Sequence, residues 1–192
     1  MSFAPFRVVT SRTIGLPTTN IDTDQIIPAR FLTTTDRDGL GEAAFRDWRF
    51  TDKDEPTDHV LNTVDRETHK IIVAGDNFGC GSSREHAAWA LTAYGVRAVI
   101  STSFGDIFKS NATKNGLLPV EVDEAILARL LEDEGGEVTI DLEAAELRFG
   151  NHVIPFETEP FARQCLLEGT DPLGALLLAL PAIEEFEREK HR

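Results

Sequence analysis

The sequence predicts an α/β fold in which a parallel βαβαβ core is joined to an added antiparallel hairpin. Three short apolar runs, typical of strands buried on both faces, alternate with two stretches of helical spacing. Farther along the chain, apolar and polar residues alternate with the period of two that indicates a half-buried hairpin. The apolar runs are residues 71–75, 97–101 and 117–120, and the alternating segments begin at Val138 and Leu147.

The first third of the chain contains one predicted strand followed by two polar segments. Residues 6–10 are expected to form the strand, and residues 18–28, rich in Thr, Asn and Asp, a turn or loop. Residues 33–57 are polar and surround Phe45, Trp48 and Phe50. We expect a long loop there, or a loop with one short helix; loops of this length are usually functional or mobile.

The helices of the core follow from apolar spacing and from the glycines that end them. Ala87, Ala90, Leu91 and Tyr94 have the i, i+3, i+4, i+7 spacing of a buried helical face, and Gly95 ends that helix. A second helix is expected at 104–112, before the Asn-Gly pair at 115–116. The crossovers between parallel strands should be right-handed.

The last third is predicted to leave the βα order. A helix near 124–131 precedes the hairpin, whose strands are joined by the EAAE turn at 143–146. Further helices are expected at 160–167 and 181–190, the second a charged, solvated end. We therefore expect residues 1–192 to form a single domain with a mobile loop at about 33–57 and a helical C-terminal tail.

Composition excludes several classes of protein. The chain has 19 Lys+Arg against 33 Asp+Glu, a net charge of −14, which argues against nucleic acid or a membrane as a partner. Its two cysteines, Cys80 and Cys165, form no secreted-type disulfide framework and are too few for an iron–sulfur cluster. No signal peptide is visible, and the longest apolar stretch, 173–180, is far shorter than the ~20 residues of a membrane helix. A cytoplasmic location is expected.

The segment from Gly75 to His86 carries the candidate chemistry, because it joins a buried strand to a helix. The carboxyl edge of a parallel sheet is where open α/β folds bind ligands. Ser82 and Glu85 have the spacing of a capping box at the helix start. The positive end of the helix and the Arg84 guanidinium both favour an anion, and a carboxylate suits the two-pronged donor set of arginine.

Other interpretations of this segment are weaker. It lacks the lysine of a Walker loop, the third glycine of a dinucleotide fingerprint and the G-x-S-x-G of an esterase elbow. A helix cap without further function remains one alternative. A thiol nucleophile at Cys80, assisted by His86, remains another. The five histidines show no ligand spacing, so no metal is expected on this chain.

The segment GDNFGCGSSREHAAWAL is similar to the signature of the aconitase superfamily's swivelling domain. With NIDTDQIIPARFL (20–32), DWRF (47–50) and SFGDIFKSNATKNGLLPV (103–120), the chain resembles the small-subunit family of 3-isopropylmalate dehydratases from about residue 5 to residue 180. The resemblance implies a swivelling β/β/α domain that stands as a separate polypeptide. It also implies a heterodimer with a larger subunit that carries a [4Fe–4S] cluster on its own cysteines.

The activity that the resemblance implies is a hydro-lyase reaction of leucine biosynthesis. It would isomerise 2-isopropylmalate to 3-isopropylmalate through 2-isopropylmaleate. By the resemblance, Ser82 is the base that removes a proton next to a carboxylate, and Ser83 and Arg84 hold a substrate carboxylate. Asp24 would support the site from behind, and Arg30 and Leu32 would contact the substrate.

Two other functions stay open from the sequence. One is a small subunit of a related dehydratase for another hydroxy-diacid, because such subunits would share the GSSRE turn. The other is a regulatory module that binds an anion at the same helix terminus without chemistry.

Overall fold

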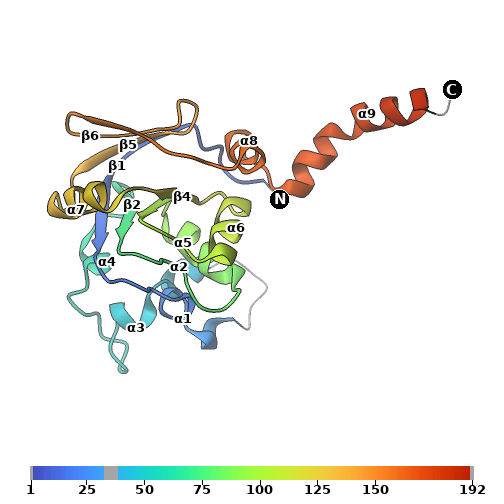
Figure 1. Cartoon of the computed structure of the whole chain (residues 1–192). Helices are drawn as coiled ribbons and strands as arrows, with labels where there is room; N and C mark the ends of the chain where they lie inside the picture. Colours follow the sequence, from blue (N-terminus) through green and yellow to red (C-terminus); the bar gives the residue numbers. More distant parts are fainter. Residues whose placement is uncertain (1, 33–38, 191–192) are drawn as a thin grey trace.

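A seven-stranded sheet forms the centre of the computed structural model, which describes residues 2–32 and 39–190. Across the sheet the strands follow the order β4-β3-β2-β1-β5-β6-β7 (Figure 1). The strands are β1 (Val8–Leu16), β2 (His69–Ala74), β3 (Ala98–Ser101), β4 (Leu118–Glu121), β5 (Glu137–Asp141), β6 (Glu146–Phe149) and β7 (His152–Pro155). The longer helices are α5 (Glu85–Tyr94), α6 (Asp106–Lys114), α7 (Glu124–Glu132), α8 (Pro160–Glu168) and α9 (Pro172–Lys190).

The parallel half of the sheet confirms the predicted βαβαβ core. Strands β2, β3 and β4 pair in parallel, and helices α5 and α6 connect them. β1 adds a fourth parallel strand beside β2 and runs well beyond the predicted residues 6–10. The polar residues Ser11 and Thr13 interrupt its apolar pattern, yet both are buried, and the Ser11 hydroxyl donates to the Thr68 carbonyl at 2.9 Å. Because these buried residues are polar, the full length of the strand cannot be recognised from a run of apolar residues.

The antiparallel half contains the predicted hairpin and one further strand. β5 pairs with β1 on one side and with β6 on the other, as expected for the hairpin. β7 then pairs with β6, with Leu147 opposite Ile154, and makes the hairpin a three-stranded meander. The side chains of β7 are exposed or half-exposed. The sequence prediction missed this strand because an edge strand of this kind shows no alternation of apolar and polar residues.

Both faces of the parallel strands are buried, but against different elements. On β2, Ile72 and Ala74 pack with α5 and α6, whereas Ile71 and Val73 pack with α7, α8 and the antiparallel strands. The continuous apolar run at 71–75 is thus explained by a covered strand. The carboxyl ends of β1 to β4 meet at one edge of the sheet, where the connecting loops lie.

The segment from residue 39 to 63 is more ordered in secondary structure than predicted. It contains three short helices, α2 (Leu40–Ala43), α3 (Arg46–Arg49) and α4 (Val60–Thr63), the first two within the region expected to hold at most one. Phe45 is buried, and its backbone amide donates to the Ile26 carbonyl at 2.8 Å. Trp48 and Trp89 pack against the core. Residues 33–38 of the predicted loop lie outside the described residues.

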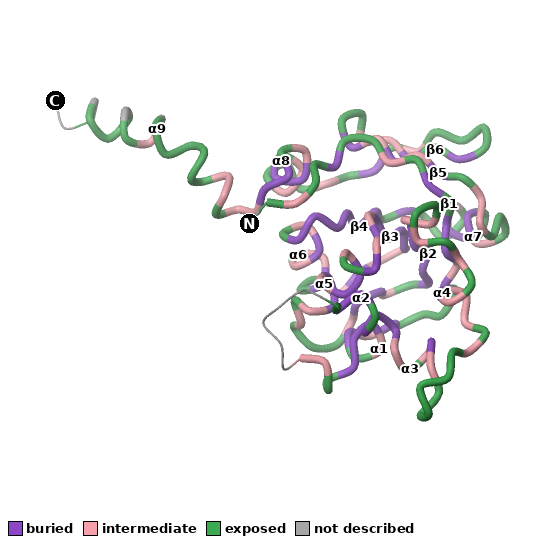
Figure 2. Tube along the Cα trace, turned by 180° about the vertical axis from the view of Figure 1, so that it is seen from behind, coloured by how far each residue is buried: buried purple, intermediate pink, exposed green. Residues whose placement is uncertain are grey.

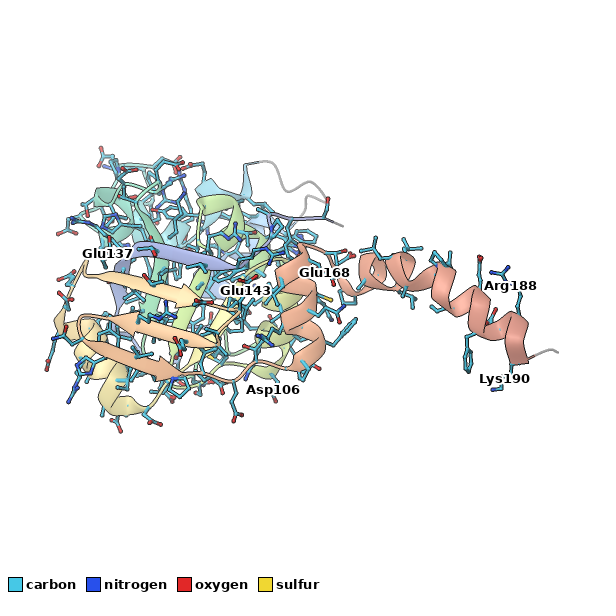
Figure 3. All side chains as sticks on the ribbon, turned by 90° about the horizontal axis from the view of Figure 1, so that it is seen from above. Asp106, Glu137, Glu143, Glu168, Arg188 and Lys190 are labelled. Atoms are coloured by element: carbon cyan, nitrogen blue, oxygen red, sulfur yellow. The ribbon has the colours of Figure 1, made fainter. Side chains whose placement is uncertain are left out.

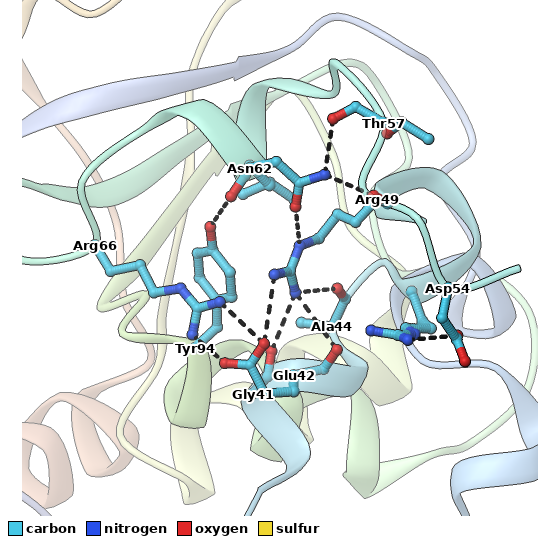
Figure 4. Close-up of polar contacts among 11 residues, drawn as sticks. Gly41, Glu42, Ala44, Arg49, Asp54, Thr57, Asn62, Arg66 and Tyr94 are labelled. Atoms are coloured by element: carbon cyan, nitrogen blue, oxygen red, sulfur yellow. Dashed lines mark hydrogen bonds and ion pairs between the residues drawn. The ribbon is translucent and has the colours of Figure 1, made fainter. Parts of the chain in front are cut away.

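A buried arginine holds this segment together (Figure 4). The Arg49 side chain is 3% exposed; its Nε donates to Asn62 Oδ1 at 3.0 Å and its Nη1 to the Ala44 carbonyl at 3.1 Å. Burial lowers the pKa of the Arg49 guanidinium. Glu42 joins the network by pairing with Arg66 at 2.7 Å, and this hydrogen bond lowers the pKa of the Glu42 carboxyl.

The C-terminal helix leaves the body of the protein. α9 projects away from the sheet beyond α8, and its surface is exposed or half-exposed along most of its length (Figures 2 and 3). It begins at Pro172, not at 181 as predicted, because Pro181 lies inside the helix and does not begin it. No helix among the described residues is both long and apolar enough to cross a membrane.

Candidate functional site

The loop from residue 75 to residue 84 leaves β2 at the carboxyl edge of the sheet and folds around two glycines. Gly79 has φ +71°, and a Cβ atom there would lie 2.2 Å from the Phe108 ring. Gly81 has φ +91°, a left-handed conformation that favours glycine. These positions explain why glycines flank Cys80 and turn the loop toward Ser82.

The same loop is fastened to the segment that follows β1. The backbone amide of Gly79 donates to the Ile21 carbonyl at 2.7 Å, and that of Thr23 donates to the Cys80 carbonyl at 3.0 Å. Asn77 Nδ2 donates to Asn20 Oδ1 at 2.7 Å. Two segments that lie nearly 60 residues apart in sequence thus run side by side. The segment that follows β1 includes the short helix α1 (Thr23–Ile26).

Ser82 lies at the surface of this paired structure, against a buried threonine. Thr23 is 1% exposed, and its hydroxyl donates to the Ser82 carbonyl at 3.1 Å. The hydroxyls of Thr23 and Ser82 lie 3.3 Å apart, within hydrogen-bond distance. Ser82 is an exposed residue, so its hydroxyl is accessible to solvent on one side, and the Thr23 hydroxyl contacts it on the other. Ser83 is also exposed.

Arg84 forms an ion pair with Asp24 on α1. The Arg84 side chain is 21% exposed and the Asp24 side chain 55%, so the pair lies at the rim of the site. The sequence assigned both residues to the site, and the fold brings them into direct contact with each other. An incoming carboxylate would meet a guanidinium that already has an acidic partner, and would have to share or displace it.

The predicted capping box at Ser82 and Glu85 is wrong. α5 begins at Glu85 with Arg84 as its N-cap, and no side chain caps it. The Glu85 carboxylate accepts instead from Asn115 Nδ2 at 3.0 Å. Ser82 lies too far before the helix to serve its first turn, which leaves its hydroxyl for other contacts. The positive end of the α5 dipole still points toward the loop.

A capping box does occur nearby, at a place that the sequence analysis missed. The Asp22 side chain accepts from the Gln25 backbone amide at 2.8 Å, and Gln25 Oε1 accepts from the Asp22 amide at 2.8 Å. The signal was visible in the sequence as an Asp followed three residues later by a Gln. This box fixes α1 and thereby the positions of Thr23 and Asp24.

The surroundings of Cys80 do not suit a nucleophilic thiol. Burial, and secondarily the Asp22 charge, raise the pKa of the Cys80 thiol, which favours the protonated form. The His86 ring packs on Trp89 with 4.6 Å between ring centroids. The alternative of a Cys80–His86 pair is therefore disfavoured.

Arg30 and Leu32 lie on the stretch that follows α1. Arg30 belongs to the 3-10 helix η1 (Ala29–Phe31) and pairs with Asp47 on α3, with one contact at 3.1 Å. Its guanidinium lies 4.8 Å from the centroid of the Phe31 ring. Leu32 is half-buried against the core. Their contact with a substrate stays a prediction.

A hollow of about 370 Å³ lies beside Arg30. It is lined by Arg30, Arg46, Asp47, Phe50, Thr51, Asp52 and Asp54. The hollow is charged on nearly every side, and neither Ser82 nor Arg84 lines it.

The described part of the chain offers no evident metal site. Within residues 2–32 and 39–190, no three His, Cys, Asp or Glu side chains come together as a possible ligand set.

Comparison with known proteins gives a consistent result. Residues 5–125 match the aconitase C-terminal domain family. A protein of Anaeromyxobacter dehalogenans (strain 2CP-C) is 54% identical over 185 residues, covers 95% of this chain and 97% of its own, and is called 3-isopropylmalate dehydratase small subunit. A protein of Herpetosiphon aurantiacus with the same name is 49% identical, covering 95% of this chain and 93% of its own.

One solved structure is also similar over nearly the whole chain. It is a 3-isopropylmalate dehydratase from Methanocaldococcus jannaschii, with 32% sequence identity and a TM-score of 0.68. The match covers 95% of this chain and 99% of that one.

Proposed function

The chain belongs to the family of 3-isopropylmalate dehydratase small subunits, within the aconitase C-terminal domain family, and from that premise we propose that Ser82 is the base of the reaction. The family makes the chain a component of a lyase in leucine biosynthesis that acts together with a large subunit. The proposed substrate is 2-isopropylmalate, which would be converted to 3-isopropylmalate through 2-isopropylmaleate.

One observation carries the proposal: Ser82, Thr23, Asp24 and Arg84 gather on two adjoining segments at the carboxyl edge of the sheet. In the proposed reaction the deprotonated Ser82 oxygen takes the proton from the carbon next to a substrate carboxylate, and the hydroxyl on the adjacent carbon leaves as hydroxide, so that the two steps together remove the elements of one water. The reverse addition of water to the other carbon gives the isomer.

A serine hydroxyl is a weak acid, so its deprotonated form needs stabilisation. Three features of this chain act in that direction. The Thr23 hydroxyl, which donates to the Ser82 carbonyl, lies 3.3 Å from Ser82 Oγ and would turn its one hydrogen to that oxygen once the oxygen carries negative charge. The positive end of α5 and the Arg84 guanidinium favour negative charge nearby. Arg84 and Ser83 would also hold the substrate carboxylate, with Arg84 released in part from Asp24.

The remaining groups complete the proposed site. Arg30 would bind the second carboxylate and Leu32 the isopropyl group. A [4Fe–4S] cluster on the large subunit would supply the Lewis acid for the leaving hydroxyl. This chain has two cysteines, whereas such a cluster usually takes four, so its ligands would come from the partner. The cytoplasmic location expected from the sequence belongs to the same proposal.

The test is turnover by the reconstituted pair. The full chain and a purified large subunit with its cluster would be mixed and assayed with 2-isopropylmalate, and in parallel with other hydroxy-diacids. We expect isopropylmalate to turn over and Ser82→Ala to lose nearly all activity while the circular dichroism spectrum stays unchanged. Ser110→Ala, an exposed serine on α6, is the matched control and should keep full activity. Turnover by Ser82→Ala would refute the assignment of the base.

The same assay separates the alternatives. Turnover of another diacid but not of isopropylmalate would make the chain a subunit of a related dehydratase. Tight binding of a dicarboxylate by the isolated chain, without turnover of any diacid by the pair, would favour the regulatory module. The Asp24–Arg84 pair argues against that module, because the guanidinium already has an anionic partner in the isolated chain.

A further inference from the structure

The helix α9 carries more of the exposed large apolar residues than any other described element. Six of the ten large apolar residues that are exposed among the described residues lie on it, and a seventh, Phe161, lies on the neighbouring helix α8. On α9 they are Leu173, Leu176, Leu177, Leu178, Leu180 and Phe186, with exposed fractions between 44% and 70%. At 19 residues the helix is about 28 Å long, and α8 is its main contact.

Four of these leucines form one continuous stripe. Leu173, Leu176, Leu177 and Leu180 are spaced i, i+3, i+4 and i+7, so they lie within about 100° of one another around the helix axis. This spacing is typical of a helix that seats its apolar face in a groove of another protein. The views in Figures 1 and 3 show the helix standing clear of the domain, where this chain cannot cover the stripe.

A lipid surface does not fit the helix. Residues 172–190 contain four glutamates but only Arg188 and Lys190 as cations. Helices that lie in membrane interfaces have polar faces rich in lysine and arginine. With a net charge of −14, the chain would also be repelled by anionic lipid.

A second copy of the chain fits poorly as well. Two copies would each bring a charge of −14. Parallel pairing of two α9 helices would place their glutamate-rich ends together, and antiparallel pairing would place those ends against the leucines. Four surface grooves of 370 to 690 Å³ on this chain are each lined by at least three charged side chains, and two leucines, Leu127 and Leu131, line one of them.

We propose that α9 is the docking helix for the large subunit, with the leucine stripe seated in an apolar groove of that subunit. This inference rests on the proposed function, which supplies the partner. The alignment with the Anaeromyxobacter dehalogenans protein supports it: it covers 95% of this chain and 97% of that one, so the stripe at residues 173–180 would have a counterpart in a protein called a small subunit even with every unmatched residue at the C-terminus. The tail is therefore not an addition peculiar to this chain.

The experiment measures the dissociation constant between the full chain and the purified, cluster-loaded large subunit. The variant Leu176→Glu/Leu177→Glu changes two side chains that are 56% and 59% exposed, so the fold should survive. The matched control is Val153→Glu on β7, which is 57% exposed and lies far along the chain from α9. Circular dichroism would confirm that both variants are folded.

We expect the leucine variant to raise the dissociation constant about a hundredfold, since burying each leucine is worth well over a factor of ten. Val153→Glu should change it less than threefold. A rise of less than tenfold in the dissociation constant of the leucine variant, or no binding by the unaltered chain, would overturn the proposal.

Two further experiments test the other occupants. Sedimentation of the chain alone should show a monomer; a dimer that the leucine variant abolishes would assign the stripe to a second copy instead. Pelleting with anionic phosphatidylserine vesicles should leave the chain in solution, and binding through the leucines would also refute the proposal.

Failure of this inference can be told from failure of the proposed function. At saturating large subunit, the leucine variant should recover the kcat of the unaltered pair, because α9 holds no residue of the site. An α9-dependent affinity without turnover of 2-isopropylmalate would keep the docking helix and reject the reaction. Turnover of 2-isopropylmalate together with an unaltered affinity in the leucine variant would keep the reaction and reject the docking helix.

Discussion

Replacement of Arg49 tests whether one buried cation stabilises the segment between α1 and β2. Arg49→Met keeps the length and apolar stem of the side chain but removes every guanidinium hydrogen bond. The loss of the two shortest of these, at 3.0 and 3.1 Å, would leave the half-buried Asn62 Oδ1 and the buried Ala44 carbonyl without their donor. An unsatisfied buried group costs about 1–3 kcal/mol. We therefore expect the free energy of unfolding to fall by about 3 kcal/mol.

Urea unfolding followed by circular dichroism would measure this loss, with tryptophan fluorescence as a second probe. Trp48 lies in the affected segment, where its ring packs 5.2 Å from Phe45. Arg46→Met on the same helix is the control. Arg46 pairs with Asp54, whose side chain is 81% exposed, and such pairs contribute less than about 1 kcal/mol. If the free energy of unfolding of Arg49→Met lies within about 1 kcal/mol of that of the unaltered chain, the hydrogen bonds of Arg49 do not stabilise the segment.

Three further predictions concern the site and its support. Thr23→Val, assayed with the large subunit, should lower kcat about tenfold (~1.4 kcal/mol) with little change in KM, because it removes the hydroxyl beside Ser82 Oγ; Thr23→Ser should restore kcat, and equal kcat values in the two variants would contradict the role. Arg84→Lys should raise KM at least tenfold, since an ammonium cannot grip a carboxylate with two parallel hydrogen bonds; a normal KM would disprove that contact. The hydrogen bond from Arg66 lowers the pKa of the Glu42 carboxyl. The stability that this bond provides is therefore present above the ordinary carboxyl pKa and is lost as the pH falls through the lowered value. The difference in unfolding free energy between the unaltered chain and Glu42→Gln should shrink between pH 6 and pH 3, and a constant difference would refute this linkage.

Much of the fold was predictable because its signals are local. The apolar run at 71–75 and the spacing of Ala87, Leu91 and Tyr94 define β2 and α5 without any knowledge of their neighbours. β1 was underestimated because Ser11 and Thr13 are polar residues whose burial depends on carbonyls far away in sequence. α9 was shortened because a proline usually begins a helix, whereas Pro181 lies within this one.

The candidate site was predictable in its location but not in its contacts. The glycine-rich turn at the end of a buried strand indicates the edge of the sheet at which the loop lies. The Asp24–Arg84 pair and the Thr23–Ser82 contact join residues about 60 positions apart, and only the fold determines that these segments meet. The predicted cap at Ser82 failed because the start of a helix is set by backbone geometry that a four-residue pattern does not define.

Several hydrogen bonds join residues 20–23 to residues 77–82, and they bear on how the proposed reaction would be organised. They make the two segments that carry the proposed site a preassembled unit, whose conformational entropy is lost once, when the subunit folds. Closure around a diacid would then move the unit as a rigid body against the opposite subunit. The speed of each cycle would depend on how the two proteins approach and separate, and not on loops that must find their shape anew.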